Sequence, residues 1–264
     1  MSEELRVVHP FAFTARVFDE VMRGFPYRQW LDYIESLLAL HGRSAISVLD
    51  LACGTGSLAL EMASGAYTVW GVDSSAEMIA VAEDKRDAAS ADVRLCVGDM
   101  RRPRAAEPPV AGHFDLITCT FDSLNALTGE GDLDAAMLAV GDLLAPGGTY
   151  VADFNTPAGL SNRWGNRLVR GKAGGAAYEW AYSYDAEANL AGLHMRFMPP
   201  GSPEVVVEDH YERGYTPNEV AAACRGAGLS VLGLYDDRSF DPPFEASDRV
   251  FVVAGGPVGR RGEG

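Results

Sequence analysis

Apolar and polar positions alternate along residues 46–154 in a repeating order of short and long segments. Five short runs rich in β-branched and other apolar residues occupy residues 47–51, 68–72, 93–97, 114–119 and 149–154. Stretches of helical length, rich in Ala, Leu and Glu, separate most of these runs. Because parallel strands need crossovers and covered faces, this order predicts a parallel sheet with helices on both sides.

The segments on either side of this region have different patterns. Residues 17–40 carry apolar side chains at three- and four-residue spacings, interrupted at 24–26, which predicts two helices joined by a bend. Residues 177–184, 190–198 and 204–213 alternate apolar and polar positions, which predicts antiparallel strands. A helix over about 216–226 and strands near 229–234 and 249–253 then resume the α/β order.

Composition narrows the classes of partner. The chain has 264 residues, 47% of them hydrophobic, which is enough for one large domain with a subdomain and a sizeable core. Its formal net charge of −15 repels phosphate backbones and anionic lipids, so we expect neither nucleic acid nor membrane as a partner. The four cysteines form no C-x-x-C pair and no secretion signal precedes them. We therefore expect reduced thiols in a soluble, cytoplasmic protein.

The stretch VLDLACGTGSLA at residues 48–59 predicts a strand, a glycine-rich turn and the start of a helix. Gly54 and Gly56 allow a ligand to approach the backbone closely, and the amides from Ser57 onward offer an anion site. The spacing Gly54-x-Gly56-x-x-Ala59 also fits the alanine form of the dinucleotide fingerprint. A plain turn without a ligand is the alternative.

Acidic residues end three successive predicted strands, at the edge where open α/β sheets bind ligands. Asp73 is placed to accept both hydroxyls of a ribose. Asp99 can accept the adenine amino group while Met100 packs on the ring, although Asp99 could instead cap the next turn. Asp50 disfavours a neighbouring pyrophosphate but suits the ammonium group of S-adenosylmethionine, unless its carboxylate belongs to the interior of the sheet.

Together these motifs resemble the class I S-adenosylmethionine-dependent methyltransferases over about residues 17–154 and again over 216–254. VLDLACGTG resembles the first motif of that family, VWGVD the second with its ribose acid, and GDM the adenine loop. FDLITCTFDSLN resembles the fourth strand and its exit, and LLAPGGTYVADFN the turn into the fifth strand. The N-terminal VFDEVMRGFPYRQW resembles small-molecule members related to glycine N-methyltransferase and to bacterial methyltransferases of unassigned substrate.

The resemblance implies a doubly wound, mostly parallel α/β sheet of seven strands with the last strand antiparallel. It divides the chain into a helical lid over 1–45, a cofactor-binding domain over 46–154 and 216–254, an inserted antiparallel β subdomain over 155–215 that covers the acceptor site, and a flexible tail over 255–264.

The resemblance also implies S-adenosyl-L-methionine as the cofactor. Arg23 would hold its methionine carboxylate, although a surface arginine is the alternative. Phe18 stands where many relatives have tyrosine, so a polar lid contact is lost there. The expected cofactor contacts are Phe18, Arg23, Trp30, Asp50, Ala52, Gly54, Gly56, Asp73, Ser74, Met78, Asp99, Met100 and Cys119.

Methyl transfer from a sulfonium is an in-line displacement that depends mainly on alignment and exclusion of water. An ammonium or hydroxyl acceptor must still lose a proton, and Asp122 and His210 are the candidate bases. Asp122 could instead be a helix N-cap, and His210 could face solvent. The alternating aromatic residues from Tyr178 to Tyr184 share one face of a strand and either line an acceptor pocket or form the core of the small sheet.

The sequence thus predicts an enzyme that methylates a nitrogen or oxygen of a small molecule, acts as a monomer or homodimer and needs no metal. An NAD-dependent oxidoreductase using the same loop, a nucleic-acid methyltransferase and a binding module without turnover are the alternatives. Asp50 disfavours the first of these. The Asn/Asp-Pro-Pro-Tyr tetrad of amino-directed DNA enzymes is missing after the fourth predicted strand, which disfavours the second.

Overall fold

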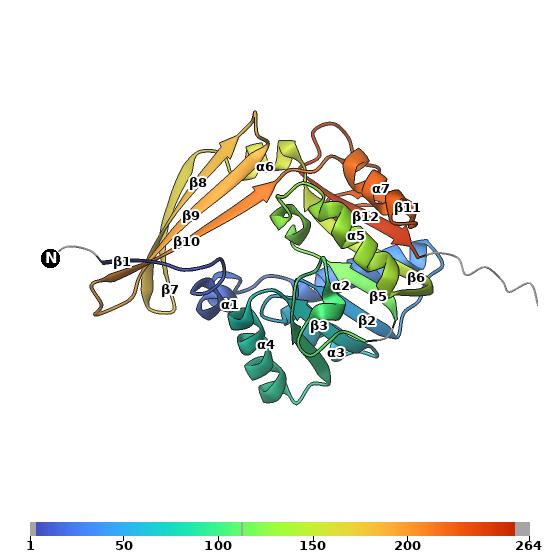
Figure 1. The fold of residues 1–264 in the computed structure, drawn as a ribbon, viewed down its shortest axis with the longest axis horizontal. Helices are drawn as coiled ribbons and strands as arrows, with labels where there is room; N and C mark the ends of the chain where they lie inside the picture. The colour runs from blue at the N-terminus through green and yellow to red at the C-terminus, as the bar shows by residue number, and fades with distance from the viewer. Residues whose placement is uncertain (1–3, 112, 257–264) are drawn as a thin grey trace, which may run out of the picture.

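Two β-sheets lie one beyond the other along the long axis of the molecule, in a computed structural model that describes residues 4–111 and 113–256 (Figure 1). The larger sheet has seven strands in the order β11-β12-β6-β5-β2-β3-β4. The smaller has five, in the order β1-β10-β9-β8-β7. The prediction of a doubly wound, mostly parallel seven-stranded sheet is therefore confirmed.

The seven-stranded sheet follows the predicted order of elements closely. Strand β12 pairs antiparallel with both of its neighbours, β6 and β11, whereas the pairings among the other strands are parallel. The strands are β2 (Ser47–Leu51), β3 (Thr68–Asp73), β4 (Val93–Val97), β5 (Phe114–Cys119), β6 (Leu144–Asn155), β11 (Ser230–Asp236) and β12 (Arg249–Gly255). Parallel pairing brings the carboxyl ends of β2, β3, β4, β5 and β6 to one edge.

Helices cover both faces of this sheet. One face carries α5 (Asp132–Leu143) and α7 (Pro217–Gly226), whose apolar side chains pack with odd-numbered residues of β2 such as Leu49. The other carries α2 (Tyr27–Leu40), α3 (Ser57–Ala63) and α4 (Ala76–Ala89), which pack against Val48 and Val151. Both faces are buried, as a parallel sheet requires.

The N-terminal region differs from the expected helical lid. Residues Glu4–Val7 form a strand, β1, and not a helix, because they extend the small sheet beside β10. The short α1 (Phe18–Val21) follows, whereas α2 is a buried layer of the large sheet, with Ile34 and Leu37 fully covered. Burial of its apolar face in the main core makes α2 part of the scaffold.

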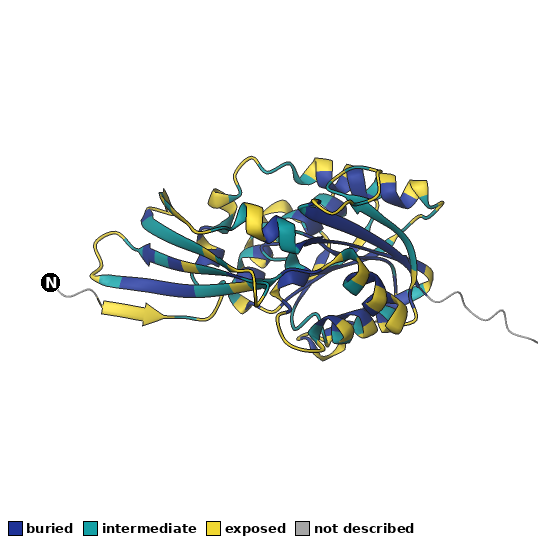
Figure 2. Cartoon of the chain, turned by 90° about the horizontal axis from the view of Figure 1, so that it is seen from above, coloured by how far each residue is buried: buried dark blue, intermediate teal, exposed yellow. Residues whose placement is uncertain are grey.

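The five-stranded sheet is built mainly of antiparallel hairpins, as predicted for its middle strands. They are β8 (Ala176–Asp185), β9 (Leu190–Met198) and β10 (Glu204–Arg213), with β7 (Arg167–Ala173) on one edge. A short helix, α6 (Pro157–Arg163), leads into β7. On the other edge β1 pairs parallel with β10, and Figure 2 shows its exposed ribbon next to the N-terminus beside a largely buried strand.

Other expectations concern particular side chains and the chain end. Cys53, Cys96, Cys119 and Cys224 are free thiols, three of them buried. In the part of the chain that the structure describes, every helix is too short or too polar to cross a membrane. The predicted flexible tail lies mostly at 257–264, outside the described residues, and its first residue, Gly255, ends β12.

Candidate functional site

The loop between β2 and α3 has the unusual backbone expected of a ligand cradle. Ala52, Gly54 and Gly56 all have positive φ angles, of 55°, 56° and 73°. A Cβ on Gly56 would lie 3.0 Å from the Cβ of Ala82 in α4, whereas a Cβ on Gly54 would meet nothing within 4 Å. Helix packing therefore explains Gly56, while Gly54 leaves open space above the loop.

Asp73, at the end of β3, is tied to this loop. Its Oδ2 accepts a hydrogen bond of 2.8 Å from the amide of Gly54, and its Oδ1 accepts one of 2.9 Å from the amide of Ser75. Burial raises the pKa of Asp73, and the two amide bonds act against this rise. Each oxygen keeps a further lone pair, so the carboxylate can still accept a pair of ribose hydroxyls.

Asp50 lies in the interior, which matches the second of its two expected environments. It is 2% exposed, and its Oδ1 accepts a 2.7 Å hydrogen bond from the hydroxyl of Thr118 on the neighbouring strand β5. Burial raises its pKa to about 7, opposed by the bond from Thr118. A nearby ammonium group would favour the ionised form, so contact with a cofactor stays a prediction.

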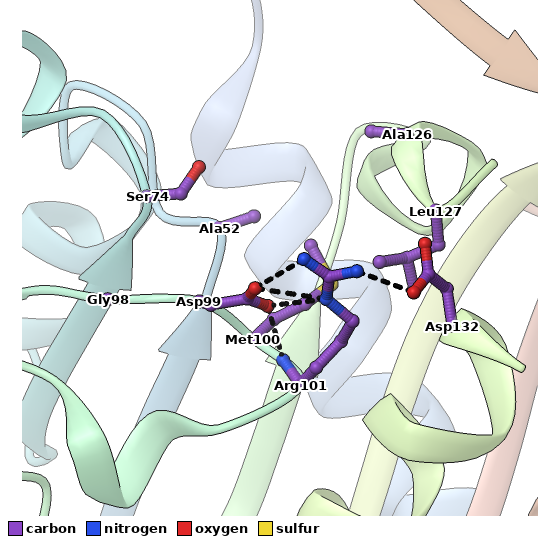
Figure 3. A pocket seen from close by; sticks show the side chains of 9 residues that line it. All are labelled: Ala52, Ser74, Gly98, Asp99, Met100, Arg101, Ala126, Leu127 and Asp132. Atoms are coloured by element: carbon purple, nitrogen blue, oxygen red, sulfur yellow. Dashed lines mark hydrogen bonds and ion pairs between the residues drawn. The ribbon is translucent and has the colours of Figure 1, made fainter. Parts of the chain in front are cut away.

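A cavity of about 230 Å³ opens at the carboxyl ends of β2, β3 and β4 (Figure 3). Arg101 spans it: its Nη2 lies 2.5 Å from Asp99, and its Nη1 lies 2.5 Å from Asp132. The bonds from Arg101 hold the pKa of Asp99 below its ordinary value. The lining residues are Ala52, Ser74, Gly98, Asp99, Met100, Arg101, Ala126, Leu127 and Asp132.

The structure brings most of the expected cofactor residues to this edge, but not all of them. Met78 and Cys119 are buried beneath it. Trp30 packs against Phe121, with ring centroids 4.5 Å apart, beside the exit of β5. Phe18 is half-buried at the start of α1. The side chain of Arg23 is 79% exposed and faces Glu20 at 4.0 Å, so this conformation corresponds to the surface arginine of the two alternatives.

The N-terminal segment touches the glycine loop through Asp19 of α1. The hydroxyl of Thr55 donates a 2.6 Å hydrogen bond to one oxygen of Asp19, and Nζ of Lys85 lies 2.8 Å from the other. Lys85 also donates a 2.7 Å bond to Ser57 at the start of α3. One carboxylate thus joins α1, the loop and α4.

A second polar group lies where β5, β6, β10 and β12 end or begin. Nη1 of Arg249 lies 2.5 Å from Asp153, and Nη2 lies 2.7 Å from Asp122. Nδ2 of Asn155 donates to Asp122 at 2.7 Å and to Glu212 at 3.3 Å. We call this group the Arg249 cluster: Asp122, Asp153, Asn155, Glu212 and Arg249.

Burial shapes the acids of the Arg249 cluster. Asp153 is completely buried, which raises its pKa to about 6 against the opposing charge of Arg249. Burial, followed by the charge of Asp122, raises the pKa of Glu212 well above its ordinary value. Asp122 itself has a left-handed backbone (φ 53°) and makes no side-chain cap for the short helix that follows, so its carboxylate is committed to the cluster.

His210, the other candidate base, is held away from solvent by a buried acid. Its Nε2 lies 3.0 Å from Glu208, whose carboxylate also accepts bonds from the backbone amides of Phe11, Phe13 and Thr14 and from the hydroxyl of Thr14. Burial acts to raise the pKa of Glu208, but these bonds together hold it below the ordinary value. The pair fastens the N-terminal segment to β10.

Part of the aromatic face of β8 belongs to the core of the small sheet, which is one of its two expected roles, and the lining of an acceptor pocket stays a prediction. Tyr178 and Trp180 stack at 4.4 Å and pack against a core cluster that includes Val17 and Phe197. Tyr182, nearer the large sheet, is contacted by Trp164 and by the guanidinium of Arg167 at 4.3 Å. This face also carries Glu208, His210 and Glu212, because their register partners on β9 lie opposite the aromatic residues.

The residues at the carboxyl edge of the large sheet fit S-adenosylmethionine. The open space over Gly54 admits a ligand next to the backbone, Asp73 has free lone pairs for hydroxyls, and the cavity beside Met100 can take a flat ring. Among residues 4–111 and 113–256, no three His, Cys, Asp or Glu side chains are grouped as metal ligands.

Several residues of the site escaped the sequence prediction. Glu212 and Arg249 lie in segments predicted as strands, and Arg101 directly follows the expected contacts Asp99 and Met100 without being named among them. A signal existed in the stretch VADFN, where Asp153 and Asn155 interrupt an otherwise apolar buried strand. A buried polar residue in a central strand requires a partner, but the sequence does not say which.

Comparison with known proteins agrees with this geometry. A family model described as a methyltransferase domain matches residues 48–148. The Bacillus subtilis protein YqeM, which is named as a methyltransferase, is 28% identical over 243 residues, 91% of this chain and 94% of that protein. An N,N-dimethyltransferase of dTDP-3-amino-3,6-dideoxy-alpha-D-glucopyranose from Streptomyces fradiae is 27% identical over 215 residues, 79% of this chain and 80% of that one.

A similar solved structure covers almost the whole chain. It is an S-adenosylmethionine-dependent methyltransferase from Clostridium acetobutylicum, with a TM-score of 0.79 and 26% identity. The match spans 94% of this chain and 99% of that one, so it includes both sheets.

Proposed function

The chain is an enzyme of the class I S-adenosylmethionine-dependent methyltransferases, and from this premise we propose that it methylates a nitrogen or oxygen of a small molecule. The acceptor would enter between the carboxyl edge of the seven-stranded sheet and the aromatic face of the five-stranded sheet. One observation carries the proposal: the open loop at Gly54 lies between acids at the ends of β2, β3 and β4.

The chain's own residues would bind and orient the two reactants. Asp73 would hold the ribose and Asp99 the adenine, with Arg101 sharing Asp99 or swinging aside. When bound, S-adenosylmethionine supplies an activated methyl group, whose bond to sulfur breaks with both electrons remaining on sulfur. The buried Trp30 and the partly buried Phe121, which pack together, would exclude water from the region around Asp122.

Nitrogen is the favoured acceptor atom. The relative from Streptomyces fradiae is named for dimethylation of an amino sugar, and it matches this chain over 80% of its length. The net charge of −15 also favours a cationic acceptor over an anionic one. We also propose a cytoplasmic location and a monomeric or homodimeric state. Size-exclusion chromatography with light scattering tests the oligomeric state.

The first experiment measures binding of S-adenosylmethionine and of NAD by calorimetry. We expect saturable binding of S-adenosylmethionine and none of NAD; the reverse result would favour the oxidoreductase. The second incubates the protein with S-adenosylmethionine labelled in its methyl group and an extract of small metabolites. Label in a small amine would support the proposal, whereas label confined to RNA or DNA would contradict it.

A further inference from the structure

The Arg249 cluster carries more negative than positive charge. Its three carboxyl groups face one guanidinium, so with all groups ionised the cluster has a net charge of −2. Arg249 is 9% exposed, and Asp153 and Asn155 are buried almost completely. Because excess charge of one sign is costly where water is excluded, a cation at this position would stabilise the cluster.

Unused hydrogen-bond acceptors indicate where that cation would bind. Asn155 is 1% exposed, and its buried Oδ1 has no hydrogen-bond partner among the described residues. Its Nδ2 points between Asp122 and Glu212, so the amide end of the side chain lies inside the cluster. For Glu212, Asn155 is the sole hydrogen-bond partner in the described part of the chain. Open acceptors call for a ligand that donates, which an ammonium group does.

Glu212 differs from the other two acids because no cation is paired with it. Asp122 and Asp153 each lie within 2.7 Å of an Arg249 nitrogen, whereas no ion pair joins Glu212 to a side chain of the described residues. The two paired acids are therefore engaged, and Glu212 is the carboxylate left to meet a ligand. Glu212 therefore fits the role of base for which Asp122 and His210 were the candidates.

The surroundings place Glu212 between the two sheets. Asn125, just after β5, donates 2.8 Å and 2.7 Å bonds to the carbonyls of Asn155 and Arg213, and so ties the end of β6 to the end of β10. Tyr182 lies on the same face of the small sheet as Glu212, and burial and, to a smaller extent, the charge of Glu212 act to raise its pKa. The carboxylate of Glu212 thus lies where the end of β10 meets the end of β6.

We propose that the Arg249 cluster binds the ammonium form of the acceptor amine and that Glu212 takes its proton before methyl transfer. This inference rests on the proposed function. In the proton step an N–H bond of the ammonium breaks and an O–H bond forms on Glu212, so the carboxylate becomes neutral and the amine recovers the lone pair it needs as nucleophile. The chemical class of acceptor is a primary or secondary aliphatic amine.

The test compares two probes that differ in one group, cyclohexylamine and cyclohexanol. Dissociation constants are measured by ligand-observed NMR on the full chain at pH 8, where the amine is cationic. We expect the amine to bind wild type at least about tenfold more tightly than the alcohol, equivalent to one favourable charge pair. In Glu212→Gln the preference should fall below about threefold. Glu187→Gln, in the exposed β8–β9 turn, is the matched control and should keep it.

A second measurement needs no variant of the cluster. Lowering the pH from 8 to 5 should reduce the preference of wild type for the amine, because burial raises the pKa of Glu212 and a carboxyl group that takes up a proton no longer attracts an ammonium ion. Asp122, Asp153, Arg249 and Tyr182 also face Glu212, and of these Asp153 titrates near 6. Repeating the series with Asp153→Asn separates the two acids, since the part due to Glu212 should remain.

The possible outcomes distinguish this inference from the proposed function. Calorimetry with S-adenosylmethionine runs in parallel on each protein. Equal binding of amine and alcohol to wild type, or an undiminished preference in Glu212→Gln, would overturn the ammonium site even if the cofactor binds. Failure of wild type to bind S-adenosylmethionine would overturn the proposed function instead, whatever the probes do.

Discussion

Thr55 donates a 2.6 Å hydrogen bond from the glycine loop to Asp19 of α1, so the N-terminal segment is fastened directly to the loop expected to hold the cofactor. Replacing Asp19 by Asn removes the ion pair with Lys85 and weakens this fastening. We expect the affinity for S-adenosylmethionine to fall about three- to tenfold, corresponding to roughly one hydrogen bond. Calorimetry measures it. Asp32→Asn, which breaks a surface pair with Arg28, is the control and should have no effect.

The role of Asp73 can be tested against that of Asp115, an acid at the opposite end of the sheet that also accepts hydrogen bonds from two backbone amides. Asp115 accepts bonds from the amides of Ile46 and Ser47, much as Asp73 does from Gly54 and Ser75. Each change to Ala should reduce the free energy of unfolding by about 1–3 kcal/mol. The affinity for S-adenosylmethionine should fall by about 1–3 kcal/mol in Asp73→Ala alone. Equal affinity in both variants would mean that the ribose is held elsewhere.

Gly54 and Gly228 allow strain and ligand contact to be separated. Both have positive φ, of 56° and 78°, and both have open space where a Cβ would lie. Alanine at either position should destabilise the fold by about 1–2 kcal/mol through left-handed strain. Gly54→Ala should also abolish measurable cofactor binding, because the methyl group occupies the open space above the loop. Thermal unfolding with and without S-adenosylmethionine reports both effects, and a ligand-induced rise in Tm for Gly54→Ala would contradict the placement.

Asp50 should give stability a pH dependence of definite sign. Its pKa in the folded protein is about 7, above the ordinary value of 3.8, so the folded state binds the proton more tightly than the unfolded state. The stabilisation by protonated Asp50 is therefore present in full below pH 4 and is lost as the pH rises to 7, by about 4 kcal/mol for a shift of about three pH units at roughly 1.4 kcal/mol each. Asp50→Asn, which can still accept the bond from Thr118, removes this loss.

Urea unfolding at pH 5, 6, 7 and 8 measures the effect of Asp50→Asn. The stability of the variant relative to wild type should increase from pH 5 to 7 and then level off. Since Asp153 titrates in both proteins, the difference between them isolates Asp50. A constant difference across the series would show that Asp50 does not change protonation there.

Arg249 should be important for stability as well as for binding. Changing it to Met leaves Asp122 and Asp153 without their cation, which we expect to cost about 3–5 kcal/mol, the usual effect of removing one partner of a buried pair. Adding Asp153→Asn should recover a substantial part of this loss, because it removes the fully buried charge. Denaturant unfolding of the single and double variants checks it. Additive destabilisation by the two changes would show that the pair is not coupled.

Local patterns predicted most of the large sheet, because each of its strands and helices carries its own apolar periodicity. The edge strands of the small sheet were missed for the converse reason. β1 has the sequence ELRV and is exposed throughout, and β7 has the sequence RLVRGKA with charged residues at three positions, so neither has a buried face to reveal it. Both are strands because of pairing with β10 and β8, which a local pattern does not contain.

The residues of the candidate site also fall into those that a local pattern predicts and those that it does not. Asp50, Asp73 and Asp99 were found because the end of a strand is visible in the sequence. The pairing of Arg249 with Asp153 was not, because it depends on the antiparallel register of β12 with β6, in which Arg249 lies opposite Asn155. Likewise Glu212 reaches Asn155 through a contact between the two sheets.

The order of strands has a consequence for chains that stop early. β12 is inserted between β6 and β11. β1 pairs with β10, which begins at Glu204, about two hundred positions downstream of β1. A nascent or truncated chain ending before Arg249 would leave the backbone of β6 unpaired along one side, a surface that invites intermolecular pairing. A chain that terminates before Arg249 should therefore aggregate and not fold into a shortened enzyme.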